Sequence, residues 1–301
     1  MHQPSNTDSG ASPIQSSELI LNSDGSIYHL HLHPEQVAPI IITVGDPDRV
    51  GKVSRYFDQI EHKVRKREFV THTGRLGNQR ISVISTGIGP DNIDIVLNEL
   101  DALFNIDLTN RQIKPQTKSL TFIRLGTAGC LQADVPVDAL VASSGAIGMD
   151  GLMQFYDAPE QQRHPLLAAL RAHTSGEWEF PVAPYFSRGH SDLLRSFPDV
   201  HHGITATNPG FYGPQGRRLR APVAQPKYLD LLQAFQYEGE RIVNLEMETA
   251  AIYGLSELLG HRAISISVIL ANRALGQFSR NPSKSVRLLL EKVLDKISNG
   301  I

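Results

Sequence analysis

The 301-residue chain has a single cysteine, Cys130, so it cannot form an intrachain disulfide. It has no run of about 18 apolar residues, the length that a helix needs to cross a bilayer. It has no surplus of basic residues either, because 29 Lys and Arg stand against 31 Asp and Glu. Neither a nucleic acid nor a membrane is therefore expected as a partner, and the cytoplasm is the expected compartment.

The N-terminal segment differs in composition from the rest of the chain. Residues 1–17 are rich in Ser, Pro, Asn and Gln, and they lack the apolar core of a signal peptide. We expect a disordered tail there. With 41% hydrophobic residues, the remaining 18–301 are long enough for one large domain with its own core.

Short β-branched segments alternate with helical patterns along this domain, which is typical of an α/β fold with a central sheet. Buried strands are predicted at 39–44, 80–85, 119–125, 139–143 and 263–269. Helices are predicted at 91–104, 228–237, 247–259 and 282–297. The polar, proline-containing segment 109–118 is predicted to lie on the surface.

The sequence GDPDRV at 45–50 follows a predicted strand and suits an anion. Gly45 allows a tight turn, and Asp46 can cap a helix whose first position is a proline. The N–H groups of such a helix start, together with Arg49, could hold a phosphate without a metal. A well-capped turn without a ligand would show the same pattern.

A second predicted strand leads into RLGTAG at 124–129, which offers Arg124, Thr127 and backbone amides in a predicted turn. Two strand ends in one sheet converge on the carboxyl edge, where α/β proteins bind ligands. A third glycine-rich turn, STGIGPD at 85–91, lacks the third glycine of a dinucleotide fingerprint but could line the same phosphate pocket.

The loop FYGPQGR at 211–217 suits a nucleobase. Gln215 can donate and accept hydrogen bonds at once, whereas Arg217 only donates, so the pair matches the carbonyl, N–H and carbonyl edge of uracil. Farther on, NLEMETA at 244–250 precedes a helical pattern. Its carboxylates could accept from adjacent ribose hydroxyls, or they could simply favour a helix N-terminus.

These segments, in this order, resemble the nucleoside phosphorylase superfamily, most closely its uridine phosphorylase branch, from about residue 27 to 294. The match also includes REF at 67–69 and NR at 272–273. The resemblance implies one catalytic domain at 18–301, with a central mixed, partly barrel-like β-sheet flanked by helices.

The resemblance also implies the site residues. Phosphate would be bound by Gly45, Arg49, Arg124 and Thr127, with Arg67 from an adjacent subunit. Ribose would contact Met247 and Glu248, with His29 reaching across the dimer interface to its 5′-hydroxyl. Uracil would lie against Phe211, Gln215, Arg217, Glu246 and Arg273. Gln215, Arg217 and Arg124 are the predicted catalytic residues.

The implied reaction is phosphorolysis of uridine, or of another pyrimidine nucleoside, to uracil and ribose 1-phosphate in nucleoside salvage. Phosphate is then a co-substrate, and no redox cofactor or metal is assigned. Some relatives bind a monovalent cation at the dimer interface through a glutamate at the place of Glu68, which the sequence leaves open. The implied assembly is a dimer or a trimer of dimers with shared active sites.

Asn272 stands near the place where purine-selective relatives carry an aspartate, which favours a pyrimidine. Ala128 and Pro90 depart from the family pattern on the phosphate side. A purine nucleoside phosphorylase, a nucleoside hydrolase of the same fold and a nucleoside sensor without activity remain alternatives.

Overall fold

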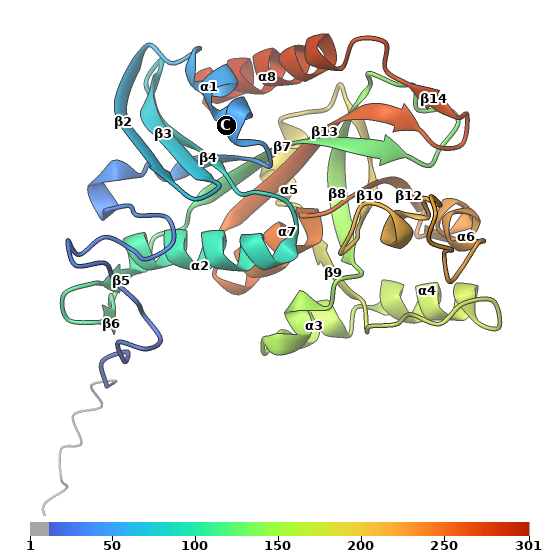
Figure 1. The fold of residues 1–301 in the computed structure, drawn as a ribbon, viewed down its shortest axis with the longest axis horizontal. Coiled ribbons are helices and arrows are strands. Elements are labelled where there is room, and N and C mark those ends of the chain that lie inside the picture. Colours follow the sequence, from blue (N-terminus) through green and yellow to red (C-terminus); the bar gives the residue numbers. More distant parts are fainter. Residues whose placement is uncertain (1–11, 301) are drawn as a thin grey trace, which may run out of the picture.

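The computed structural model describes residues 12–300, which form one sheet-centred α/β structure (Figure 1). Its strands are β1 (Ile40–Val44), β2 (Gln59–Lys66), β3 (Phe69–Leu76), β4 (Gln79–Ser85), β5 (Ile106–Asp107), β6 (Gln112–Ile113), β7 (Thr121–Cys130), β8 (Leu140–Gly148), β9 (Tyr185–Arg188), β10 (His201–Thr207), β11 (Gln236–Tyr237), β12 (Glu240–Glu246), β13 (Arg262–Asn272) and β14 (Gln277–Phe278).

The helices are α1 (Pro47–Ser54), α2 (Pro90–Asn105), α3 (Pro159–Gln162), α4 (Pro165–Thr174), α5 (Ser191–Arg195), α6 (Tyr228–Ala234), α7 (Thr249–Leu258) and α8 (Pro282–Ser298). Three short 3-10 helices are η1 (Pro34–Gln36), η2 (Leu152–Phe155) and η3 (Gly213–Gln215). None of the helices among residues 12–300 is long and apolar enough to cross a membrane.

The main sheet has the strand order β11-β12-β10-β8-β13-β7-β1-β4-β3-β2, with β9 paired to β8 and β14 paired to β13. β12 also pairs with β7, so that β7, β13, β8, β10 and β12 close into a ring. Parallel and antiparallel pairs both occur in it. The predicted mixed, partly barrel-like sheet is therefore confirmed.

Helices cover both faces of this sheet (Figure 1). Ile41 and Phe122 pack with the apolar sides of α2 and α7, whereas their neighbours Ile42 and Ile123 pack with α1 and α8 on the other face. This division follows from the alternation of side chains along a strand. Since both faces are covered, the central strands are apolar almost throughout, which is why they were recognisable in the sequence.

β1 lies between β4 and β7, and both pairings are parallel. Val44 is opposite Ser85, and Thr43 is opposite Arg124. The carboxyl ends of these strands therefore meet at one edge, as predicted.

The predicted strands correspond to β1, β4, β7, β8 and β13, and the predicted helices to α2, α6, α7 and α8. α6 ends at Ala234, and the short strand β11 takes the place of its expected last turn. The segment 109–118 is mostly exposed, as expected. No prediction was made for β2, β3, β10 or β12.

The prediction of a turn at 124–129 was wrong, because β7 continues through this segment to Cys130. Gly129 and Cys130 pair with β12, and residues 124–130 pair in parallel with β13. Two glycines made the segment look like a turn, but continuous pairing with β13 overrides that local preference. Residues 125–128 therefore pair with β13 on one side only, and on the other side the carbonyl of Leu125 accepts from Arg49.

Of the predicted tail, residues 1–11 lie outside the described residues. In the rest of it, Ile14 donates its backbone N–H to the carbonyl of Arg111 at 2.7 Å. The carbonyl of Gln15 accepts from Glu18 and Leu19. This contact attaches residues 14–19 to the β5–β6 hairpin.

Candidate active site

The turn after β1 starts α1. Asp46 caps this helix by accepting from the N–H of Asp48 at 2.9 Å, and Pro47 occupies its first turn, as predicted. A Cβ at Gly45 would lie 3.3 Å from the carbonyl oxygen of Gly87, so glycine lets the turns after β1 and β4 approach closely. The helix start thus lies beside the STGIG turn.

Arg49 points from α1 to the adjacent strand, where its guanidinium donates to the carbonyl of Leu125 at 3.3 Å. Burial lowers the pKa of Arg49, and the guanidinium of Arg124 acts in the same direction. Two cations therefore lie close together at the carboxyl edge of β1 and β7, which favours an anion between them.

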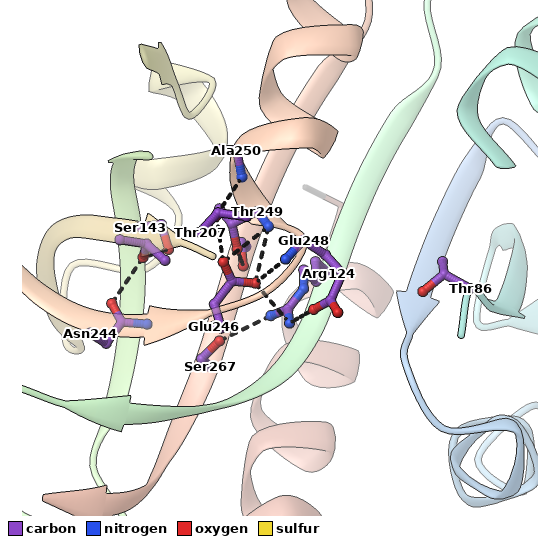
Figure 2. A network of polar contacts seen from close by, with 12 residues as sticks. Thr86, Arg124, Ser143, Thr207, Asn244, Glu246, Glu248, Thr249, Ala250 and Ser267 are labelled. Atoms are coloured by element: carbon purple, nitrogen blue, oxygen red, sulfur yellow. Dashed lines mark hydrogen bonds and ion pairs between the residues drawn. The ribbon is translucent and has the colours of Figure 1, made fainter. Parts of the chain in front are cut away.

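Arg124 is buried and lies at the centre of a polar network (Figure 2). Its Nη2 is 2.9 Å from Oε2 of Glu246 and 2.5 Å from Oε2 of Glu248, and its Nη1 donates to Oγ of Ser267 at 3.2 Å. Burial alone would lower the pKa of Arg124, but the two carboxylates outweigh it and raise that pKa. Arg124 therefore stays charged.

Glu246, at the end of β12, fills the space beneath the start of α7. Its carboxylate accepts from the N–H groups of Glu248 at 2.9 Å and of Thr249 at 3.0 Å, and from the hydroxyl of Thr207 at 2.6 Å (Figure 2). A carboxylate is stabilised there by the free N–H groups of the helix. The arrangement fixes the position of Arg124.

Glu248 connects α7 to α2. Its Oε1 accepts from the backbone N–H of Gly89 at 2.9 Å, directly before Pro90 opens α2. Gly89 has φ 107°, a backbone conformation that favours glycine. Burial raises the pKa of Glu248 and Arg124 opposes that rise. Met247 lies half-buried between the two glutamates.

The loop at 211–217 forms a second cluster. Arg217 donates through Nη1 to Oε1 of Gln215 and to the carbonyl of Phe211, both at 2.7 Å. Its guanidinium carbon lies 3.7 Å from the centre of the Phe211 ring. Arg273 donates to the carbonyl of Gln215 at 3.1 Å. The structure thus brings four of the predicted base-binding residues together.

Burial and the neighbouring Arg273 lower the pKa of Arg217 to about 10. The guanidinium is still charged near neutral pH. This cluster is connected to the sheet through Gly129, where a Cβ would lie 3.7 Å from Arg217 and also from Arg273. β7 therefore contacts both clusters. Arg124 belongs to the polar network with Glu246 and Glu248, and Gly129 lies beside the cluster of the loop 211–217.

Asn272 has a structural role in this conformation. Its Nδ2 donates to the carbonyls of Gln132 at 2.9 Å and Val135 at 2.8 Å, while its Oδ1 accepts from the N–H of Leu275 at 2.9 Å. Three of its hydrogen-bonding positions are thus used by the backbone.

Two predicted residues, His29 and Arg67, take no part in the hydrogen bonds described for these clusters. The hairpin tip that carries Arg67 nevertheless reaches the STGIG turn, where a Cβ at Gly87 would lie 3.3 Å from Cγ of Glu68. His29 contacts Glu99, which lies about 14 Å along α2 from Pro90 at 1.5 Å per residue. Arg67 is exposed at the tip of the β2–β3 hairpin, with φ 55°. Thr127 is half-buried on β7, opposite Val268 of β13.

Two further residues shape the site and were not predicted: Thr207 and Ser267. Gly89 and Gly126 lie in segments that were singled out, but their individual roles were not predicted. Thr207 is a polar residue at the end of the strand β10 and Ser267 is one in the middle of β13, a signal that could have been used. A Cβ at Gly126 would lie 1.8 Å from Nη1 of Arg124, so this glycine leaves room for the guanidinium. No sequence pattern indicates that.

Two cavities lie elsewhere. One of about 420 Å³ lies along residues 171–184, and one of about 320 Å³ is lined by Trp178, Tyr228 and the back of the base loop at Gly213 and Pro214. Neither is lined by Arg49 or Arg124, so the polar network and not cavity size identifies the candidate site. Within residues 12–300 no three His, Cys, Asp or Glu side chains are grouped as metal ligands.

Comparison with known proteins shows to which superfamily the chain belongs. A model of the phosphorylase superfamily matches residues 39–297, and the chain therefore belongs to that superfamily. It is 29% identical to the uridine phosphorylase of Thermococcus kodakarensis, over 93% of this chain and 89% of that protein. It is 27% identical to the Escherichia coli uridine phosphorylase, over 83% and 88%.

A solved nucleoside phosphorylase of Trypanosoma brucei, described as showing uridine phosphorylase activity, superposes with a TM-score of 0.84. It is 29% identical, and the match covers 94% of this chain and all of that one. These relatives support the resemblance to the uridine phosphorylase branch, and the chain is a pentosyltransferase.

Proposed function

We propose that this enzyme cleaves uridine with inorganic phosphate, giving uracil and ribose 1-phosphate. The observation that carries the substrate assignment is the Gln215–Arg217 pair, with its short hydrogen bond and the adjoining Phe211 ring. Gln215 still has an amide N–H and a lone pair to offer, and Arg217 has further N–H donors. That set matches the carbonyl and N–H edge of uracil.

The other cluster supports phosphate as the nucleophile. Arg49 and Arg124 supply positive charge beside the start of α1, and a hydrolase that used water would not need them. Glu248, held by Gly89 and Arg124, is oriented to accept from ribose hydroxyls. Met247 would pack against the sugar.

Charge development assigns the roles. As the bond between C1′ of ribose and N1 of uracil lengthens, the sugar becomes positive and the base negative. Phosphate held by the arginines faces the cationic sugar and then bonds to C1′, while Arg217 stabilises the departing base at a carbonyl oxygen.

We infer further that the active site is shared between subunits of a homo-oligomer. His29 and Arg67, which take no part in the hydrogen bonds described for the two clusters of their own chain, would each complete a neighbour's site. The resemblance to uridine phosphorylases supports this arrangement.

The first experiment is to measure uracil release from uridine with and without phosphate, using inosine and guanosine as control substrates. Release that requires phosphate and is confined to uridine is expected. Release without phosphate would indicate a hydrolase, and binding without turnover a sensor.

A purine substrate is the second candidate, because a guanosine phosphorylase of Halorubrum lacusprofundi is 24% identical over 91% of this chain. Cleavage of guanosine or inosine in preference to uridine would overturn the assignment made from Gln215 and Arg217.

A further inference from the structure

Glu99 makes an unusual number of contacts with one short segment. Its carboxylate accepts from the backbone N–H of His29 at 3.0 and 3.1 Å, from the N–H of Leu30 at 2.9 Å, and from Nδ1 of the His29 ring at 2.6 Å. The side chain of Glu99 is 13% exposed and that of His29 is 28% exposed. The histidine is thus fixed at both its backbone and its ring.

The ring contact selects a tautomer. An ionised carboxylate can only accept hydrogen bonds, so the proton of a neutral His29 ring must lie on Nδ1. The lone pair is then on Nε2, and the negative charge of Glu99 makes that nitrogen a better acceptor. Such an acceptor suits a hydroxyl group and repels an anion.

We propose that Glu99 is a positioning residue for the ribose 5′ end. It holds His29 so that Nε2 accepts from the 5′-hydroxyl of a nucleoside in the neighbouring subunit's site, which selects nucleosides over their 5′-deoxy and 5′-phosphate forms. This inference rests on the proposed function.

If Glu99 only held the backbone of this segment in place, a negative charge would not be needed. The backbone N–H groups of His29 and Leu30 could be bound by any acceptor, and the amide oxygen of glutamine would serve. Glu99→Gln keeps such an oxygen, but its NH₂ group would face Nδ1 and move the ring proton to Nε2. The variant therefore preserves the brace and removes the acceptor.

The test compares two substrates, uridine and 5′-deoxyuridine, in saturating phosphate. We expect Glu99→Gln to lower kcat/KM for uridine roughly tenfold, the typical worth of one hydrogen bond, mainly through KM. For 5′-deoxyuridine, which has no 5′-hydroxyl, the change should be less than about twofold. In a His29→Ala background, Glu99→Gln should have no further effect.

Asp101→Asn is the matched control, because Asp101 is another carboxylate of α2 that faces a histidine, His261, at 3.2 Å. It should change both substrates equally. An equal loss with both substrates in Glu99→Gln, or no loss with either, would show a brace only and overturn the proposal. If the wild type cleaves both substrates equally well, the role of His29 fails while the proposed function stands. If the wild type releases no uracil from uridine in phosphate, both fail.

Discussion

Replacing Gly126 by alanine tests the geometry of the phosphate cluster directly. A Cβ at this position would lie 1.8 Å from Nη1 of Arg124, 2.6 Å from its Cζ and 2.8 Å from Oγ of Ser267. Gly126 is not among the glycines with positive φ, so the backbone itself would accept alanine. The effect of the substitution therefore depends on these side chains, and above all on the guanidinium.

Two effects of Gly126→Ala on the free energy of unfolding have opposite signs. Without the clash, alanine in place of glycine should stabilise the protein by about 0.5–1 kcal/mol, because the unfolded chain loses entropy. With the clash, the guanidinium must leave Glu246 and Glu248, and disrupting such a buried ion pair costs about 3–5 kcal/mol. We therefore expect net destabilisation of roughly 2–4 kcal/mol.

Urea unfolding and the KM for phosphate measure the two consequences separately. Because the guanidinium is the end of a flexible side chain, the variant should still fold, but phosphate should bind much more weakly. Gly129→Ala on the same strand is the control, since its Cβ would meet nothing closer than 3.7 Å. A Gly126→Ala enzyme as stable as the wild type, with unchanged KM for phosphate, would refute the placement of Arg124.

Three further predictions concern the base side of the site. Arg217→Ala should lower kcat about 100-fold, corresponding to about 3 kcal/mol of lost stabilisation of the leaving base, with a smaller change in KM; near-normal turnover would exclude this role. Since burial and Arg273 lower the pKa of Arg217 to about 10, its charge is lost at lower pH than for an ordinary arginine. Wild-type kcat should therefore fall as pH rises through about 10, and Arg217→Ala should lack that decline. Asn272→Asp should destabilise the protein by about 2–3 kcal/mol, because a carboxylate would face the carbonyls of Gln132 and Val135. It should not create inosine cleavage, and inosine turnover by this variant would contradict the structural role of Asn272.

Local structure could be predicted from the sequence where one segment contains all the residues that determine it. GDPDRV contains the glycine, the cap and the proline of its own helix start, and the parallel arrangement of β1, β4 and β7 then brings separate motifs to one edge. β2 could not be recognised in the same way. It lies at the edge of the sheet with mostly exposed side chains, so its sequence shows no apolar alternation.

The site itself was only partly predictable. The residue types that bind charge were visible, but their partners depend on contacts between distant segments, such as Gly89 with Glu248 or Thr207 with Glu246. Gly126 illustrates the limit, because its role depends on the direction in which the side chain two residues earlier points.

The charges of one chain explain why a neighbour should complete the site. Arg49 and Arg124 supply two positive charges, and Glu246 and Glu248 supply two negative ones, so this group is neutral before phosphate binds. A phosphate dianion would leave it with two uncompensated negative charges, which burial makes costly. A third cation would remove part of that excess, and Arg67, exposed at the tip of the β2–β3 hairpin, is the one that we propose a neighbouring subunit supplies. Electrostatics within the chain and the resemblance to uridine phosphorylases therefore support the same shared site.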